Sequence, residues 1–227
     1  MKLLTLDVGN TTVDACEFLG KQVKHLGRFP HRDLKIESKD YDLVVAVSVK
    51  PSFNDVLERA FPNRLKLLSL DDIPMEIYYK TPHFLGTDRV LFAYGVRELY
   101  SEDALLVMAG TALVVDLLLE GKFWGGFITA GVGLKLKALS EKAEGIPHMS
   151  LKPTDITVGM STEEVVLGGT YLESVSFIEK TAERWFKEFN KELPVYITGG
   201  DGWLFEKLGT YDPLLLHRAM HRIIINP

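Results

Sequence analysis

Two segments of this chain share one order of features: an apolar strand, a tight turn with glycine, and a second apolar strand that returns. The first has strands at 2–6 and 12–18 around Gly9-Asn10, and the second has strands at 105–108 and 113–119 around Gly110-Thr111. Helical patterns follow each pair, which predicts an α/β fold of mixed sheets flanked by helices. No Pro-, Ser- or Gly-rich linker divides the chain, and we expect a boundary near 101–104, giving domains 1–103 and 104–227.

The remaining apolar patterns predict further strands and helices. A capping signature, Ser161 followed by Glu164, starts a long helix. Its stripe of Val165, Leu172, Val175, Ile178, Ala182 and Trp185 is typical of core or of a subunit interface. The other expected elements are strands at 43–47, 65–70, 122–128 and 195–197, and helices at 52–60 with Ser52 as N-cap, at 87–100, and from Asp212-Pro213 to about Ile225.

Composition narrows the classes of partner. The net charge is −5 and the pI is about 5.7, with no long run of like charges. A nucleic-acid-binding domain usually has a basic stripe, so we expect no nucleic-acid partner. Cys16 is the single cysteine, which excludes an intramolecular disulfide and suggests a small buried side chain. No signal peptide or membrane-spanning run occurs, so we expect a cytoplasmic protein without a membrane partner.

The segment from Asp7 to Thr11 carries the first candidate chemistry. A strand that ends in Asp and enters a Gly-Asn turn places backbone N–H groups around one point, where phosphate oxygens can bind. The Asp7 carboxylate can hold a hydrated Mg²⁺ against those phosphates. The alternative is a plain hairpin turn, since Gly-Asn is a good turn dipeptide.

Two further glycine turns support the phosphate interpretation. Gly110-Thr111 repeats the first turn in the second half, and two such hairpins can grip one nucleotide between them. The Gly199-Gly200 turn lies at a strand-to-helix junction, where glycine lets the backbone approach a flat group such as adenosine. Three glycine turns in this order favour a nucleotide site.

Gly86-Thr87-Asp88-Arg89 is the next constellation. Asp88 lies in the first turn of a predicted helix and can accept a proton from a substrate hydroxyl, while Arg89 can grip a carboxylate with two hydrogen bonds. The alternative makes Thr87 or Asp88 an N-cap and Arg89 a surface residue. Tyr79 can line a pocket or belong to the core. His217 and His221 have a metal-binding spacing but no third ligand nearby.

With these residues in view, the chain resembles the type III pantothenate kinases, a family also labelled as Baf-family transcriptional activator accessory proteins. The resemblance runs almost from end to end. Its motifs, in chain order, are Asp7-Val8-Gly9-Asn10-Thr11, Val47-Ser48-Val49-Lys50-Pro51, Tyr79-Lys80-Thr81-Pro82, Leu85-Gly86-Thr87-Asp88-Arg89, Gly110-Thr111-Ala112 with Asp116, Gly125-Gly126-Phe127-Ile128, Gly131, Ile146-Pro147, Gly159-Met160-Ser161-Thr162 with Gly168, and Thr198-Gly199-Gly200-Asp201.

The resemblance implies two actin-like ATPase domains of the ribonuclease H-like type, and a homodimer. It implies ATP- and Mg²⁺-dependent phosphorylation of pantothenate to 4'-phosphopantothenate, the first step of coenzyme A synthesis, with Asp88 as proton acceptor. Pantothenate would contact Tyr79, Gly86, Thr87, Asp88, Arg89 and, from across a dimer interface, Thr162. ATP would contact Thr111 and a first loop made of Asp7, Val8, Gly9, Asn10, Thr11, Thr12, Val13 and Asp14.

Three positions depart from the family pattern. Met108 stands where the second loop usually begins with an Asp that helps to hold a monovalent cation, K⁺ or NH₄⁺. A thioether is a poor ligand for a hard cation, so cation dependence is in question. Val114 replaces a usual Thr, and Ala130 replaces a usual Pro. Two other functions therefore stay open: a non-catalytic regulator on the same fold, and a kinase of another small acceptor such as an N-acetyl sugar.

Overall fold

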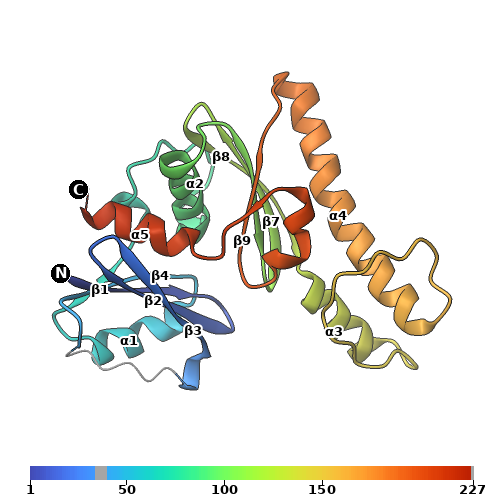
Figure 1. Cartoon of the computed structure of the whole chain (residues 1–227), viewed down its shortest axis with the longest axis horizontal. Helices are drawn as coiled ribbons and strands as arrows, with labels where there is room; N and C mark the ends of the chain where they lie inside the picture. The colour runs from blue at the N-terminus through green and yellow to red at the C-terminus, as the bar shows by residue number, and fades with distance from the viewer. Residues whose placement is uncertain (34–39, 226–227) are drawn as a thin grey trace. The chain divides into compact units, whose positions relative to one another are not determined.

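The computed structural model describes residues 1–33 and 40–225, and its chain divides into two compact units (Figure 1). The first contains residues 1–102, 121–123 and the C-terminal segment from Leu214. The second contains residues 103–120 and 124–213. The first boundary, just after residue 102, lies close to the expected one between residues 103 and 104. The C-terminal segment, however, belongs to the first unit, whereas the expected domains place it in the second.

The first unit is built on a five-stranded mixed sheet with the order β3-β2-β1-β4-β5. β1 pairs antiparallel with β2 and parallel with β4, so the strand–turn–strand prediction is confirmed there. β3 was not predicted from the sequence, because its side chains are mostly exposed and polar. The strands are β1 (Lys2–Val8), β2 (Thr12–Leu19), β3 (Gln22–Pro30), β4 (Leu43–Ser48) and β5 (Leu65–Leu67).

Helices cover both faces of this sheet. On one face Leu4, Leu6 and Val8 join the apolar residues of α1 (Pro51–Ala60) in a buried cluster. The other face carries the alternate residues and packs against α5 (Leu215–Ile225), which in turn contacts α2 (Thr87–Leu99). The prediction of Ser52 as the α1 N-cap is wrong: Lys50 is the N-cap, because Pro51 is suited to the first helical position.

The second unit repeats the topology of the first. Its sheet has the order β10-β9-β6-β7-β8, again with a central strand that pairs antiparallel with its successor and parallel with a later strand. Two units with one topology account for the repeated strand–turn–strand pattern in the sequence. The strands are β6 (Ala104–Ala109), β7 (Ala112–Leu119), β8 (Lys122–Ala130), β9 (Val195–Thr198) and β10 (Thr210–Tyr211).

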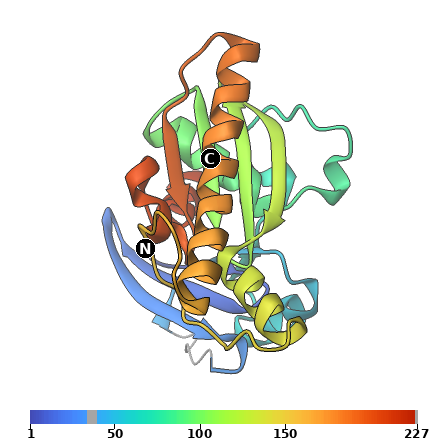
Figure 2. The same cartoon turned by 90° about the vertical axis from the view of Figure 1, so that its right-hand side faces the viewer.

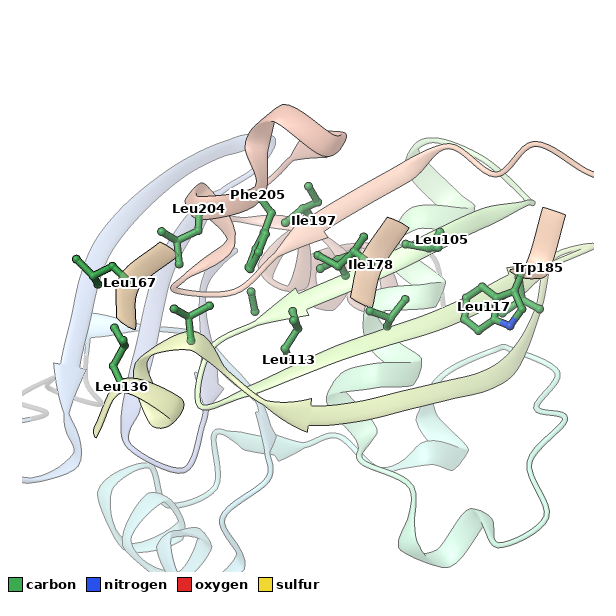
Figure 3. Close-up of a cluster of buried hydrophobic side chains, with 14 of the residues drawn as sticks. Leu105, Leu113, Leu117, Leu136, Leu167, Ile178, Trp185, Ile197, Leu204 and Phe205 are labelled. Carbon is green, nitrogen blue, oxygen red and sulfur yellow. The ribbon is translucent and has the colours of Figure 1, made fainter. Parts of the chain in front are cut away.

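Helices α3 (Val132–Lys142) and α4 (Thr162–Phe189) close the core of this unit. Figure 2 shows α4 as one long helix running along the sheet. Its Ile178 and Trp185 point into a cluster with strand residues such as Leu105 and Leu117 (Figure 3). Of the predicted stripe, however, Val165 and Leu172 are 58% and 64% exposed, so only part of it is core.

Ser161 is the N-cap of α4, as its sequence predicts. The Ser161 side chain accepts a hydrogen bond from the Glu164 N–H at 3.3 Å, and the Glu164 carboxylate accepts one from the Met160 N–H at 2.7 Å. The first bond satisfies an N–H that the helix leaves without a partner, and the second holds the residue before the cap instead of the Ser161 N–H that a capping box would use. None of the helices among residues 1–33 and 40–225 combines the length and apolar content that crossing a bilayer requires.

Candidate active site

The first loop is a tight turn between β1 and β2. The Gly9 N–H donates to the Thr12 carbonyl at 2.9 Å, which closes the turn. Two side chains from elsewhere in the unit hold its carbonyls: His31 Nε2 donates to Gly9 O at 3.0 Å, and Lys50 Nζ donates to Asn10 O at 3.1 Å. Neither residue was predicted to have a role, although Lys50 follows a strand that runs parallel to β1.

A row of charged residues crosses the sheet beside this loop. Asp7 on β1 lies directly opposite Asp14 on β2, and Asp14 lies opposite Arg28 on β3. Arg28 donates to the Asp14 carboxylate through Nη2 at 2.6 Å and Nε at 2.8 Å, and His25 Nε2 lies 2.6 Å from the other oxygen. Burial alone would raise the pKa of Asp14, but His217, Arg28 and His25 outweigh it and lower the pKa to about 2.

Asp14, Cys16 and His25 also offer three ligand atoms within 4.8 Å of one another, a geometry that a metal ion could use. The electrostatics oppose it. The Asp14 carboxylate already pairs with a guanidinium, and burial followed by the Asp14 charge raises the pKa of the Cys16 thiol to about 12. A thiol must lose its proton to bind metal. We therefore interpret this group as the surroundings of the Asp14–Arg28 ion pair, and not as a metal site.

The two histidines of α5 belong to the same face but have separate partners. His217 Nδ1 hydrogen-bonds Thr5 Oγ1 at 2.8 Å, and its Nε2 lies 3.5 Å from Asp14. His221 stacks on Phe18 with ring centroids 4.4 Å apart. His217 therefore makes a buried hydrogen bond and His221 packs against an aromatic ring, and the two do not form a pair of metal ligands.

Asp7 has the most perturbed carboxylate of this face. Burial, then the charges of Asp88 and Asp14, raise its pKa to about 7, against a smaller opposing effect of Arg28. Asp88 is therefore near enough to repel Asp7, and one unit holds the predicted metal ligand and the predicted base together. Carboxylate oxygens are the donors that Mg²⁺ prefers, so this acidic group fits a hydrated Mg²⁺ that would relieve the repulsion.

The segment from Gly86 to Arg89 forms the start of α2, with Gly86 as the N-cap. The Asp88 carboxylate accepts the Arg89 N–H at 2.9 Å. A Cβ on residue 86 would overlap this carboxylate oxygen, so glycine is needed for the observed orientation of Asp88. The alternative that Thr87 or Asp88 is the N-cap is therefore wrong, because Gly86 holds that position, and the Asp88 carboxylate instead bonds the N–H of the next residue and raises the pKa of Asp7.

Arg89 is buried, which contradicts its interpretation as a surface residue. Its side chain is 7% exposed, and its guanidinium carbon lies 5.7 Å from the ring centres of both Tyr79 and Phe123. Cation–π contacts of this kind hold the guanidinium plane in one orientation. Tyr79 and Arg89 are therefore neighbours in the first unit, as two residues of one substrate pocket would be.

The glycine turns of the second unit lie against one another. The Asp201 N–H donates to Ala109 O at 3.0 Å, and the Gly131 N–H donates to Thr111 O at 2.9 Å. Gly199 has φ of +94°, and a Cβ there would overlap the Ala109 carbonyl. Only glycine allows this approach, so the Gly110-Thr111 loop and the Gly199-Gly200 turn are joined by their backbones.

Met108 lies on the sheet face opposite the core of the second unit. Its neighbours Val107 and Ala109 belong to the core, whereas Met108 pairs across the sheet with Val114 and Thr198. Neither cross-strand partner carries a carboxylate that would replace the missing Asp. Thr162, the remaining predicted substrate contact, is exposed at the start of α4 in this unit.

Comparison with known proteins gives consistent matches. The family model for type III pantothenate kinase matches residues 3–184. A type III pantothenate kinase of Aquifex aeolicus is 46% identical over 224 residues, covering 99% of this chain and 97% of the relative. Another, from Kosmotoga olearia, is 32% identical and covers 90% and 87%.

Solved structures agree with the fold. A protein of Campylobacter jejuni described as a Baf-family transcriptional activator aligns with a TM-score of 0.71 at 22% identity, over 98% of this chain and 97% of that one. One described as a 2-dehydro-3-deoxygalactonokinase, from Sinorhizobium meliloti, aligns at 0.60 and 10% identity, with 99% of each covered. At such identities the likeness concerns the fold alone, and it confirms the predicted fold class of two mixed sheets flanked by helices.

Proposed function

Since the chain belongs to the type III pantothenate kinase family, we propose that it transfers the γ-phosphoryl group of ATP to the hydroxyl of pantothenate, forming 4'-phosphopantothenate for coenzyme A synthesis. The observation that carries the proposal is the group formed by Asp7, Asp88 and Arg89 within one unit. There a carboxylate with a pKa raised to about 7 faces a second carboxylate at the start of a helix, beside a buried guanidinium.

The first loop, from Asp7 to Asp14, would bind the phosphates of ATP through its backbone. In the second unit, Thr111 and the Gly199-Gly200 turn are proposed as nucleotide-binding residues. Phosphoryl transfer depends chiefly on positioning and on stabilising the charge of the phosphoryl oxygens. Mg²⁺ bound through water to Asp7 would supply part of that stabilisation. The His31 contact supports this role, because it holds the Gly9 carbonyl of the loop.

Asp88 is proposed as the general base that accepts the proton of the pantothenate hydroxyl. Its place at the start of α2, near enough to Asp7 for its charge to raise the pKa of that carboxyl, supports this role. Arg89 would bind the pantothenate carboxylate through its planar fork. Tyr79 already contacts that guanidinium, and Gly86 and Thr87 precede it at the start of α2.

We assign Thr162 a contact to pantothenate bound in the partner subunit of a homodimer. The exposure of Val165 and Leu172, one and three turns farther along α4, supports an interface on this helix. Sedimentation equilibrium of the wild type and of Leu172→Glu tests it: the wild type should sediment as a dimer and the variant should weaken the association.

For the second loop, we propose that turnover does not require K⁺ or NH₄⁺, because Met108 stands where the family usually has the Asp carboxylate that helps to hold such a cation.

A coupled ADP-release assay with pantothenate, ATP and Mg²⁺, run in sodium and in potassium buffer, tests the main proposal. Turnover should appear in both buffers, and Asp88→Asn should lower kcat by at least about a hundredfold, the usual scale for loss of a general base. Asp155→Asn, an exposed change in the second unit, is the matched control. If turnover is absent in both buffers, the result would favour the alternative of a non-catalytic regulator on the same fold. If only N-acetyl sugars are phosphorylated, the result would favour a kinase of another acceptor.

A further inference from the structure

Lys50 lies beside the first loop because of the parallel pairing of β1 and β4. Val8 pairs with Ser48 at the carboxyl ends of these strands, and the Val49 N–H donates to Val8 O at 3.0 Å. Ligands of open α/β sheets bind at the carboxyl ends of such strands. The residues that follow Ser48 are thus placed next to those that follow Val8, and Lys50 Nζ reaches the Asn10 carbonyl at 3.1 Å.

The backbone of Lys50 is held firmly on both sides. Its N–H donates to Ser48 Oγ at 3.2 Å, and its carbonyl accepts the Phe53 N–H at 2.9 Å in the first turn of α1. Pro51 restricts the chain further at the next position. Because the backbone is fixed, only the flexible side chain decides where the ammonium group lies, and it lies on the loop.

The cations around this loop differ in what they bind. Arg28 makes two short bonds to the Asp14 carboxylate, which neutralise its charge locally. Lys50 instead donates to a neutral carbonyl and is partly exposed, not buried. An ammonium has three donors, and hydrogen bonds to anionic oxygens are about twice as strong as those to neutral acceptors. A phosphate bound at the loop would therefore compete well for this group.

We propose that Lys50 binds the phosphate oxygens of the nucleotide at the first loop. The inference rests on the proposed function for the identity of the ligand, and adds a residue to the loop from 7 to 14. In the absence of nucleotide the ammonium holds the Asn10 carbonyl. When a polyphosphate occupies the loop, the same group donates to the phosphate and offsets part of the negative charge of its oxygens.

Calorimetric titration of the full chain with MgADP and with adenosine, without pantothenate, tests this. Lys50→Met should weaken MgADP binding at least about tenfold, the scale of one lost charge-assisted hydrogen bond, and should leave adenosine binding unchanged. Lys50→Arg should restore most of the affinity. Lys24→Met, an exposed lysine of β3, is the matched control and should bind as the wild type does. In steady state, Lys50→Met should raise the KM for ATP more than it lowers kcat.

Several results would overturn the inference. One is a Lys50→Met variant that binds MgADP within about twofold of the wild type. Another is an equal loss of MgADP and adenosine binding, which would mean that Lys50 only supports the conformation of the turn. Both leave the proposed function standing if the wild type still phosphorylates pantothenate. A wild type that neither binds MgADP nor turns over would remove the proposed function and this inference together.

Discussion

Replacing Asp7 by asparagine should stabilise the first unit at neutral and alkaline pH. The Asp7 pKa is about 7 in the folded protein and 3.8 as the reference for the unfolded chain, so the folded state binds the proton more tightly. Stability therefore falls as the pH rises from about 4 to about 7, and it stays lower above that range. The pKa difference of about three units corresponds to an upper limit of about 4 kcal/mol, and partial exposure of Asp7 reduces the expected gain to about 2–3 kcal/mol.

Urea denaturation near pH 5 and near pH 8, without Mg²⁺ or nucleotide, measures this effect. Far-UV circular dichroism follows both units, whereas the three tryptophans, Trp124, Trp185 and Trp203, all belong to the second unit and report it separately. Asp7→Asn should exceed the wild type in free energy of unfolding near pH 8 by more than it does near pH 5. Asp33→Asn, whose side chain is 54% exposed in the same unit, is the matched control.

The outcome that would refute the reasoning is an equal effect of Asp7→Asn at the two pH values, or a loss of stability near pH 8. Mg²⁺ gives an independent check. If the raised pKa reflects crowded carboxylates that a cation relieves, Mg²⁺ should stabilise the wild type near pH 8 and should stabilise Asp7→Asn much less. Equal stabilisation of both proteins would place the cation elsewhere.

Three further substitutions test the fold around the site. Gly199→Ala should lower the affinity for MgADP and the melting temperature, because the new Cβ meets the Ala109 carbonyl; an unchanged titration would contradict this. Phe205→Ala in the second core should cost about 3–5 kcal/mol of unfolding free energy in urea, against less than about 1 for the exposed Trp203→Phe. Ser161→Ala should cost about 1 kcal/mol by loss of the α4 cap, and Ser161→Asp should restore it, which thermal denaturation will show.

The sequence by itself determined the local features of this protein. Apolar strands broken at Gly9 and Gly110 predict the two strand–turn–strand units, because glycine and the side-chain period act within a few residues. The same holds for the α4 cap at Ser161 and for the start of α2 after Gly86. Motif order was also enough to indicate the family, since it needs only the identity and spacing of residues.

Only the tertiary structure decided the electrostatics of the site. The Asp14 carboxylate lies beside His217, which comes from a helix about two hundred positions away in the sequence. The charge of Asp14 in turn raises the pKa of Asp7. The sequence left open whether Arg89 binds a substrate or lies on the surface, and the packing of Tyr79 and Phe123 against its guanidinium shows that it is buried. Such contacts arise from strand register and from the return of α5 to the first unit, and these depend on how distant segments pack together. A local pattern therefore predicts the loops and their glycines, whereas the charges around them follow from the packing.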